Sequence, residues 1–172
     1  MVDYSFSTRW LVGASADRVH EALADIAAWP EWWRGVTRAE PIGPESTGGV
    51  GSRYRFVFRS RLPYSLRFEM TVVEHEPSRS IVGRATGELE GTGRWTLSPQ
   101  GNSTLVRYDW DVRTTRWWMN LIGPLARPIF EANHDQIMEW GQTGLGRRLH
   151  AAVTVAQPPS GSGSSRGAPT GD

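Results

Sequence analysis

The stretch Leu105-Val-Arg-Tyr-Asp-Trp-Asp-Val112 decides the fold class, because apolar and charged side chains alternate along it. The two faces of this stretch are Val106, Tyr108, Trp110 and Val112 on one side and Arg107, Asp109 and Asp111 on the other. A period of two residues is typical of a β-strand with one face buried and the other in water. The stretch therefore predicts a half-buried strand.

The residues before this strand repeat the pattern. Four further segments read as strands: Arg53–Arg59, Leu66–Val73, Ile81–Thr86 and Gly93–Leu97. In the first of them, aromatic residues alternate with Arg, and Val57 is the one exception. Short spacings with turn residues separate the segments, which favours an antiparallel meander.

The residues after the last strand change to a helical period. One apolar stripe runs towards Ala152 and is formed by Phe130, Ile137, Gly141, Leu145 and Leu149. Gly141 and Gly144 each weaken a helix by roughly 1 kcal/mol relative to Ala. Their position on or beside the stripe predicts that another element approaches the helix closely.

The segment from Arg116 to this stripe contains Pro124 and Pro128, which disfavour a regular helix. We therefore expect a broken helical segment or a lid there. Trp117-Trp118-Met119 through Ile129-Phe130 is either a mobile portal or a packed connection.

The start of the chain predicts a strand over Tyr4–Val12, with Tyr4, Phe6, Trp10 and Val12 broadly on one side. Ser15 is a suitable N-cap for a helix whose apolar positions are Val19, Ala22, Leu23 and Ile26. Because Pro30 disfavours helical backbone at the residue before it, we expect this helix to end at Trp29-Pro30. Pro30–Trp33 is expected to begin a second short helix, and Pro41–Gly51 to form turns.

This order of elements predicts an α+β fold, in which a curved antiparallel sheet wraps around one long C-terminal helix. Two short helices follow the first strand. Only the final helix is long enough to cover the apolar face of the sheet. A curved sheet and one helix need not touch everywhere, so we expect a cavity between them.

Composition narrows the function classes. The chain has 172 residues, a formal net charge of +1, 38% hydrophobic and 22% charged residues. No basic field favours nucleic-acid binding, so no nucleic acid is expected as a partner. All 19 basic residues are Arg, which excludes a lysine Schiff base and a P-loop. With no Cys, thiolate catalysis and cysteine-ligated metals are excluded as well.

The length suits one domain, which we place at residues 1–156. Residues 157–172 are rich in Pro, Gly and Ser and are expected to be a disordered tail. The first residues carry no secretory signal, and no apolar run reaches the ~20 residues of a membrane span. A cytoplasmic location and no stable membrane insertion are the expectations, whereas the oligomeric state stays open.

Several segments give the chain a family resemblance. They are the opening strand, Ser15-Ala-Asp-Arg-Val19 and Ile26-Ala-Ala-Trp-Pro-Glu-Trp-Trp33. Over roughly Tyr4 to Ala152 the chain resembles the START/Bet v 1-like superfamily (SRPBCC), which has the helix-grip fold. Gly91-Thr-Gly-Arg-Trp95 and Asn133-His-Asp135 resemble its polyketide cyclase/dehydrase-like branch.

The resemblance implies a deep hydrophobic cavity between the sheet and the C-terminal helix. Members of the superfamily include lipid carriers, hormone receptors, quinone-binding proteins and polyketide aromatase/cyclases, and the fold does not choose among them. The aromatase/cyclases use a Tyr after the Trp-Pro segment and an Arg near the end of the second meander strand. Here Val36 and His75 occupy these places, which argues against cyclase chemistry.

The apolar faces of the predicted elements give the candidate ligand-binding residues. They are Tyr54, Phe56, Phe68, Trp95, Tyr108, Trp110, Phe130 and His134. Ordinary core packing explains the aromatic residues equally well. Two charged sets, Asp109 with Asp111 and Arg55, Arg59, Arg67 with Glu69, are interpreted as solvated outer faces.

His134 is the candidate catalytic residue, because it shares the helical stripe with Phe130 and Ile137. It either hydrogen-bonds a ligand or moves a proton, or it is a core histidine with a protein partner. The other three histidines have no metal-ligand spacing, so neither a metal nor a cofactor is predicted. His20 and His150 are expected on solvated helix faces, and His75 at a strand end.

Three functions follow from these residues. The first is binding of a small hydrophobic molecule, such as a lipid, a polyketide or another polycyclic or aromatic compound, in the cavity. The second is a polyketide cyclase/dehydratase-type enzyme that uses His134 as acid and base. The third is a quinone or lipid carrier that presents Trp117-Trp118 to a membrane.

Removal of the tail tests the domain boundary. Because the residues after Ala156 have almost nothing to bury, a chain that ends at Ala156 should keep the melting temperature of the full chain. Thermal unfolding of the two chains side by side measures this. A large loss of melting temperature would show that the tail packs on the domain.

Overall fold

An eight-stranded antiparallel sheet forms most of the computed structural model, which describes residues 3–43, 48–115 and 123–157. The strands are β1 (Asp3–Val12), β2 (Val36–Pro41), β3 (Arg53–Arg59), β4 (Ser65–Glu76), β5 (Ser80–Gly87), β6 (Leu89–Gln100), β7 (Ser103–Thr114) and β8 (Val153–Val155). The helices are α1 (Ala16–Ala24), the 3-10 turn η1 (Ile26–Ala28), α2 (Trp29–Trp32) and α4 (Gly123–Leu149). The architecture is the predicted α+β helix grip.

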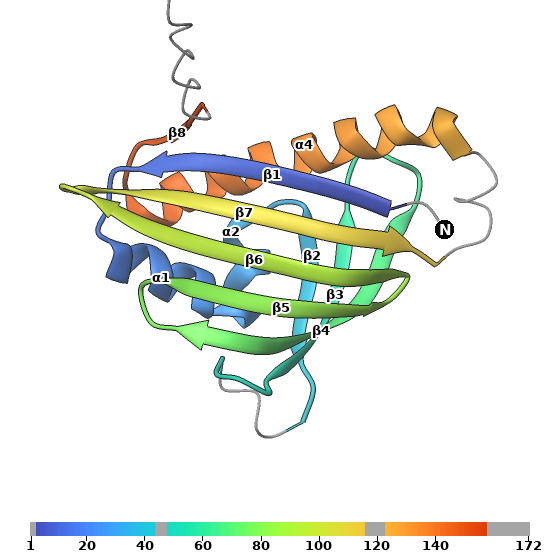
Figure 1. Ribbon diagram of the computed structural model, residues 1–172, viewed down its shortest axis with the longest axis horizontal. Helices are drawn as coiled ribbons and strands as arrows, with labels where there is room; N and C mark the ends of the chain where they lie inside the picture. Colours follow the sequence, from blue (N-terminus) through green and yellow to red (C-terminus); the bar gives the residue numbers. More distant parts are fainter. Residues whose placement is uncertain (1–2, 44–47, 116–122, 158–172) are drawn as a thin grey trace, which may run out of the picture.

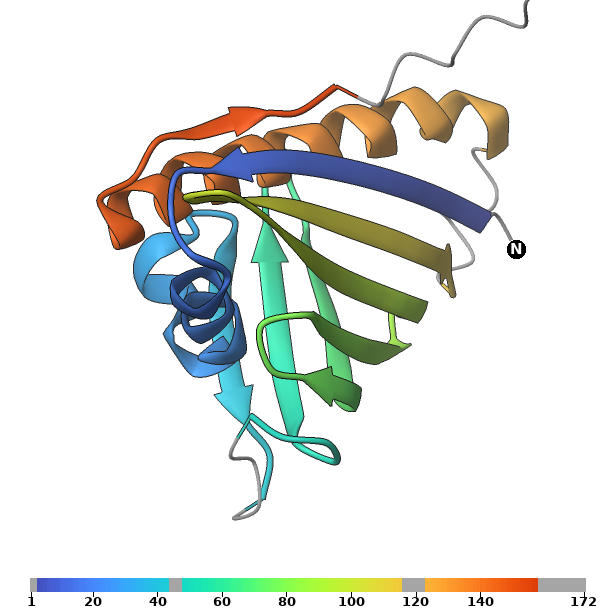
Figure 2. The ribbon, with the colours of Figure 1, turned by 60° about the vertical axis from the view of Figure 1, so that its left-hand side comes forward.

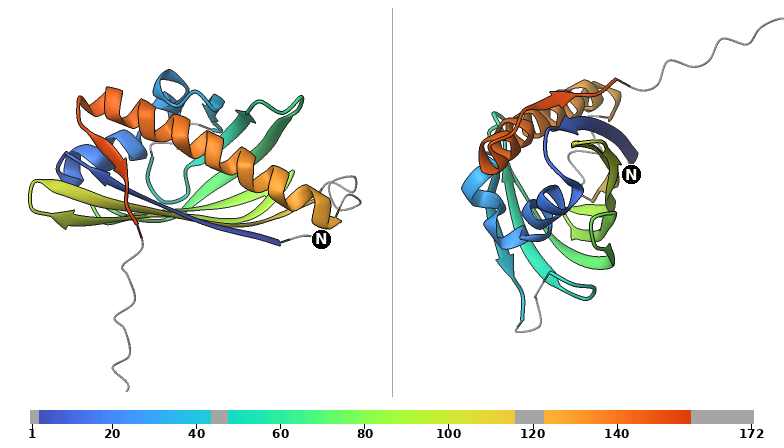
Figure 3. Two further views of the ribbon diagram at one scale, coloured as in Figure 1. Left: turned by 90° about the horizontal axis from the view of Figure 1, so that it is seen from above. Right: turned by 90° about the vertical axis from the view of Figure 1, so that its left-hand side faces the viewer.

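The sheet has the order β2-β3-β4-β5-β6-β7-β1-β8, so β3 to β7 form the predicted meander. It curves strongly: β2 and β3 run across the direction of β6 and β7 (Figure 1). Helix α4 lies along β1 on the open side of the curve, as two views confirm (Figures 1 and 2). In the end-on view on the right of Figure 3, the sheet curves around the interior of the domain and α4 lies on one side.

The alternation of residues 105–112 places the two faces of β7 as predicted. Val106, Trp110 and Val112 are buried, whereas Arg107 and Asp111 are exposed. On β1, Tyr4, Trp10 and Val12 are buried and Phe6 is half-buried. The concave face of the sheet therefore carries the core, and α4 supplies the opposite wall.

The charged outer faces are also confirmed. Asp109 pairs with Arg107 at 2.8 Å, and Ser5 donates a hydrogen bond to Asp111. Glu69 accepts from Arg53 at 2.9 Å and from Arg55 at 3.2 Å. The hydrogen bonds from Arg55 and Arg53 lower the pKa of the Glu69 carboxyl.

Two predictions about the first helices are wrong. Helix α1 ends at Ala24 and not at Trp29, because Asp25 leaves the helical region and a 3-10 turn follows. Trp29 keeps helical dihedrals although Pro30 follows it, so α2 begins at Trp29 with Pro30 in its first turn. A proline is tolerated there because the first helical N–H groups have no partner within the helix.

The prolines near the start of α4 do not break it. Pro124 lies in the first turn, where no N–H is needed. Pro128 lies within the helix and removes the bond to the carbonyl of residue 124, near the helix end. The expected lid over residues 116–122 lies outside the described residues, as does most of the tail. Among the described helices, none has the length and the apolar composition required to cross a bilayer.

Close contact between α2 and α4 explains the glycines of the helical stripe. A Cβ at Gly144 would lie 1.8 Å from the carbonyl oxygen of Trp32, and one at Gly141 would lie 2.6 Å from the Trp33 ring. Both distances are far below van der Waals contact. The two glycines therefore let the Trp32-Trp33 backbone and rings rest on the helix, as the sequence predicts.

Gly144→Ala tests this contact. A gain in helix propensity of about 1 kcal/mol should be outweighed, because the Cβ collides with backbone that cannot rotate away. We expect a net loss of about 1–3 kcal/mol in the free energy of unfolding, measured with denaturant. Gly49→Ala is the control, since nothing lies within 4 Å of its Cβ position. An equal effect of the two substitutions would contradict the contact.

Candidate ligand cavity

The space between the sheet and α4 holds a partly open, largely apolar cavity with a volume of about 70 Å³. Its walls come from β1, the α2 region, β3, β4, β6, β7 and α4. The lining residues are Tyr4, Phe6, Trp29, Trp33, Phe58, Leu66, Phe68, Met70, Leu89, Tyr108, Trp110, Val112, Thr114, Phe130, Asn133, His134, Ile137 and Met138. The volume is well below the roughly 300–1,000 Å³ of drug-sized ligand pockets.

Five of the eight predicted site residues line this cavity: Phe68, Tyr108, Trp110, Phe130 and His134. The other three lie behind the wall. Phe56 stacks on Phe68 with 5.5 Å between ring centroids, and Trp95 stacks on Tyr108 at 4.1 Å. Tyr54 is buried beside Phe56. These three support the lining aromatic rings without facing the space.

Sequence patterns also point to some of the lining residues that we did not single out. Tyr4 and Phe6 lie on the apolar side of the predicted first strand, and Phe58 and Met70 alternate with charged residues. Asn133 gave no signal of its own, because an Asn next to a stripe is usually exposed. Its side chain reaches the cavity only because α4 passes this close to β1.

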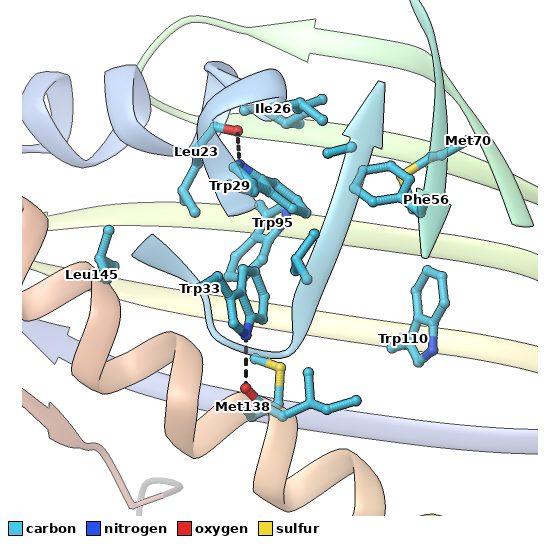
Figure 4. Packing of buried hydrophobic residues seen from close by; sticks show 14 of the residues in the cluster. Leu23, Ile26, Trp29, Trp33, Phe56, Met70, Trp95, Trp110, Met138 and Leu145 are labelled. Carbon is cyan, nitrogen blue, oxygen red and sulfur yellow. Dashed lines mark hydrogen bonds between the residues drawn. The ribbon is translucent and has the colours of Figure 1, made fainter. Parts of the chain in front are cut away.

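A hydrogen bond between α2 and α4 fixes the inner wall of the cavity. The indole N–H of Trp33 donates to the backbone carbonyl of Ile137 at 2.7 Å (Figure 4). Gly141 lies one turn further along α4, and its missing Cβ leaves room for the ring. Trp29 donates to the carbonyl of Leu23 at 3.1 Å, which ties α2 to α1 (Figure 4).

Trp110 and Tyr108 form part of the sheet wall over Gly93. A Cβ at Gly93 would lie 2.7 Å from the Trp110 ring and 2.8 Å from the Tyr108 hydroxyl. The glycine therefore lets both rings lie flat against β6. Burial raises the pKa of the Tyr108 phenol, so the hydroxyl stays protonated.

Polar atoms interrupt the apolar wall where β1 faces α4. The Tyr4 hydroxyl, the Asn133 side-chain oxygen and both ring nitrogens of His134 are buried and have no hydrogen-bond partner among the described residues. All three side chains line the cavity. Buried polar groups normally have partners, so this cluster is suited to a polar group of a ligand or to water.

His134 packs its ring on an aromatic side chain. Its centroid lies 4.2 Å from that of Phe6, and the planes are nearly parallel at 9°. The nearest acid, Asp135, is exposed and lies 3.7 Å from Nδ1, which is beyond hydrogen-bonding distance. Burial lowers the pKa of His134, and Asp135 opposes this only in part. The imidazole is therefore neutral at pH 7, with one N–H and one lone pair available.

The other sequence candidates lie away from the cavity. Val36 is buried at the start of β2, and His75 lies on β4 outside the cavity. The expectation for His20 is wrong: it is half-buried and its Nε2 lies 2.7 Å from Nε2 of His75. His150 is exposed after the end of α4, as expected. No group of three or more acidic or histidine side chains in the described ranges is placed to hold a metal ion.

Residues 4–160 match the sequence profile of a family described as polyketide cyclase / dehydrase and lipid transport. The chain belongs to this family. It is thus a member of the START/Bet v 1-like superfamily, polyketide cyclase-like, as its sequence segments indicate. No protein with a curated description matches the chain in sequence.

Solved structures show the same fold. A START superfamily protein from Mycobacterium smegmatis is 19% identical, with a TM-score of 0.66, over 86% of this chain and 97% of that one. The aromatase/cyclase Zhui from a Streptomyces strain is 16% identical, with a TM-score of 0.64, over 87% and 94%. The di-domain aromatase/cyclase StfQ of the steffimycin pathway is 15% identical, with a TM-score of 0.64. This chain spans about half of StfQ, 52% of its length.

His134→Phe tests the unpaired imidazole. A folded state with a lowered histidine pKa binds fewer protons than the unfolded chain, so stability is lost as the pH falls below about 6.5. Removing His134 should remove that loss, and Phe should stack on Phe6 in its place. We expect the variant to be as stable as wild type at about pH 7.5 and more stable at about pH 5.5. Denaturant unfolding at both values measures this.

His150→Asn is the matched control, since His150 is exposed and Asn tolerates its positive φ of 48°. It should leave the pH dependence of stability unchanged. A destabilised His134→Phe protein at about pH 7.5 would mean that the imidazole has a protein partner.

Proposed function

We propose that this domain binds a small, mainly apolar molecule that carries a carbonyl or hydroxyl group. One observation carries the proposal: a largely apolar cavity whose wall holds the unpaired polar atoms of Tyr4, Asn133 and His134. Apolar pockets with a few convergent polar groups are the usual form of a small-molecule site. A purely apolar wall would favour a lipid carrier, and this wall is not purely apolar.

The donors and acceptors of the cluster define which polar groups a ligand needs in order to form hydrogen bonds there. Neutral His134 has one N–H donor and one acceptor nitrogen, and the Asn133 oxygen is an acceptor. A ligand carbonyl can accept from His134 or from the Tyr4 hydroxyl. A ligand hydroxyl can donate to Asn133 or to His134. A charged group finds no opposite charge among the lining residues, so a neutral ligand is favoured.

The cavity volume favours a ligand of one ring at most, and even one ring needs some movement of the walls, because a cavity that holds benzene has about 150 Å³. A volume of about 70 Å³ leaves no room for a polycyclic polyketide unless the aromatic walls move. Trp33 and Trp110 are held in place by a hydrogen bond and by the close contact with Gly93, respectively. Larger compounds of the same chemistry would therefore bind with rearrangement and lower affinity.

Titration calorimetry with acetophenone and ethylbenzene tests this proposal, because the two differ by one carbonyl oxygen. Wild type should bind acetophenone about 10-fold or more tightly than ethylbenzene, since one hydrogen bond to a buried group is worth about 1–3 kcal/mol. In His134→Phe the preference should fall, while ethylbenzene binds as before. His150→Asn should keep the wild-type preference.

The absence of saturable binding of either compound to the folded protein would reject a one-ring ligand site. Equal preference for acetophenone in wild type and in His134→Phe would show that His134 does not orient the ligand. Tyr4→Phe and Asn133→Leu then identify which of the other polar groups does so.

A second candidate function is proton transfer at a carbon next to a carbonyl. The observation that favours it is the neutral, unpaired imidazole of His134 inside the cavity. Such a base can remove a proton from the carbon next to a bound carbonyl. Exchange of the acetyl protons of acetophenone in heavy water, followed by NMR, would then be accelerated by wild type and not by His134→Phe.

A further inference from the structure

A pair of histidines joins two elements outside the cavity. His20 on α1 and His75 near the end of β4 are 55 residues apart, yet their Nε2 atoms lie 2.7 Å from each other. The ring centroids are 4.9 Å apart, and both side chains are half-buried. The contact ties the first helix to the hairpin between β4 and β5.

The short distance between the two Nε2 atoms leaves room for one proton between them, and not for two. A hydrogen bond between imidazole nitrogens needs an N–H on one ring and a lone pair on the other. One added proton leaves the hydrogen bond in place, because the charged ring donates to the lone pair of the neutral one. When both rings are protonated, two N–H groups point at each other and both rings carry a positive charge. The pair must then separate.

Charged groups surround the pair on both elements. On α1, Asp17 and Glu21 favour the protonated form of His20. Burial and His75 oppose it more strongly, so the pKa of His20 is lowered. Asp17 also accepts a hydrogen bond from Ser78 in the turn after β4.

On β4, two exposed acids flank His75. Glu74 forms an ion pair with Arg94 of β6 at 3.2 Å, so its carboxylate already has a partner on the sheet. Glu76 is exposed next to the turn, where Arg79 is also exposed. These groups are exposed to water, and none of them replaces the hydrogen bond between the two imidazole rings.

We propose that His20 and His75 form a proton-operated latch that holds α1 against β4 and releases it as the pH falls. The link to the cavity is short. The carbonyl of Leu23 on α1 accepts the indole N–H of Trp29, and Trp29 lines the cavity. Release of α1 therefore loosens one wall of the cavity in acid, whatever the cavity binds.

His75→Gln separates the latch from ordinary packing. The amide oxygen of Gln accepts a hydrogen bond from His20 whether His20 is neutral or charged, and Gln takes no proton. The variant should therefore keep α1 attached at both ends of the pH range. His20→Gln is the reciprocal variant, and it covers the case in which the first fails to fold.

Hydrogen exchange of the α1 amides gives a local readout. Between about pH 8 and about pH 5.5, wild-type protection of α1 should fall about threefold or more after correction for the intrinsic effect of pH. His75→Gln should lose clearly less, and His150→Asn should behave as wild type. The amides of β3 are the internal control, since α1 packs chiefly on α4, β6 and β7. The NMR titration of His20 should also move towards its ordinary pKa in His75→Gln.

Two outcomes would overturn the latch. One is wild-type protection of α1 that is the same at both pH values. The other is a wild-type response that persists in both Gln variants. Because the readout needs no ligand, neither outcome depends on whether the cavity binds acetophenone.

Discussion

The hydrogen bond from the Trp33 indole to the Ile137 carbonyl is the interaction on which the rest of the structure depends. A strongly curved sheet leaves one side open, and α4 must close it at a distance that still leaves internal space. Trp33 sets that distance on one side of the helix, because its ring fits only against Gly141. A large side chain on α4 at this point would push the helix outward, and a small one at residue 33 would let it collapse.

The same contact explains why the aromatic residues only partly fill the interior. The rings of Trp29, Trp33, Trp95 and Tyr108 pack against one another in a continuous group, which lies at one end of the space. At the other end, the His134 ring stacks on the Phe6 ring, and the Tyr4 ring packs against Phe130. The cavity remains between a dense aromatic wall and a wall with three polar side chains. A ligand bound as proposed would take a preferred orientation in such a cavity, with its polar group towards α4.

Much of the fold could be predicted from periodicity, because sheet faces are repeated over many residues. Alternation in Leu105–Val112 placed Tyr108 and Trp110 on the concave face, and helical spacing placed Phe130 and His134 on the facing stripe. The missed elements are those with little periodic content. Strand β2 has two buried side chains, Val36 and Ala39, and β8 has three residues in all. Their pairing is decided by tertiary contact with β3 and β1, which no local pattern contains.

The candidate site was harder to predict than the fold for a similar reason. Tyr54, Phe56 and Trp95 have the same alternation as Phe68 and Trp110, yet they lie behind the cavity wall. Which rings face the space depends on the curvature of the sheet and on the distance to α4. The His20–His75 contact depends on the packing of α1 on a distant hairpin. Spacing along the chain contains none of these quantities.

The cavity wall also bears on the choice between binding and catalysis. Dehydration of a β-hydroxy ketone needs a base for the proton next to the carbonyl and an acid for the departing hydroxyl. One neutral imidazole can serve both steps: it takes the carbon-bound proton, the C–O bond breaks, and the same proton leaves with the hydroxyl as water. His134 therefore needs no second acid, and the exposed position of Asp135 does not argue against such a reaction. What the reaction does need is a donor that holds the carbonyl oxygen, where negative charge develops. The Tyr4 hydroxyl is such a donor, because it is unpaired at the cavity wall and burial raises its pKa, so that it carries its proton.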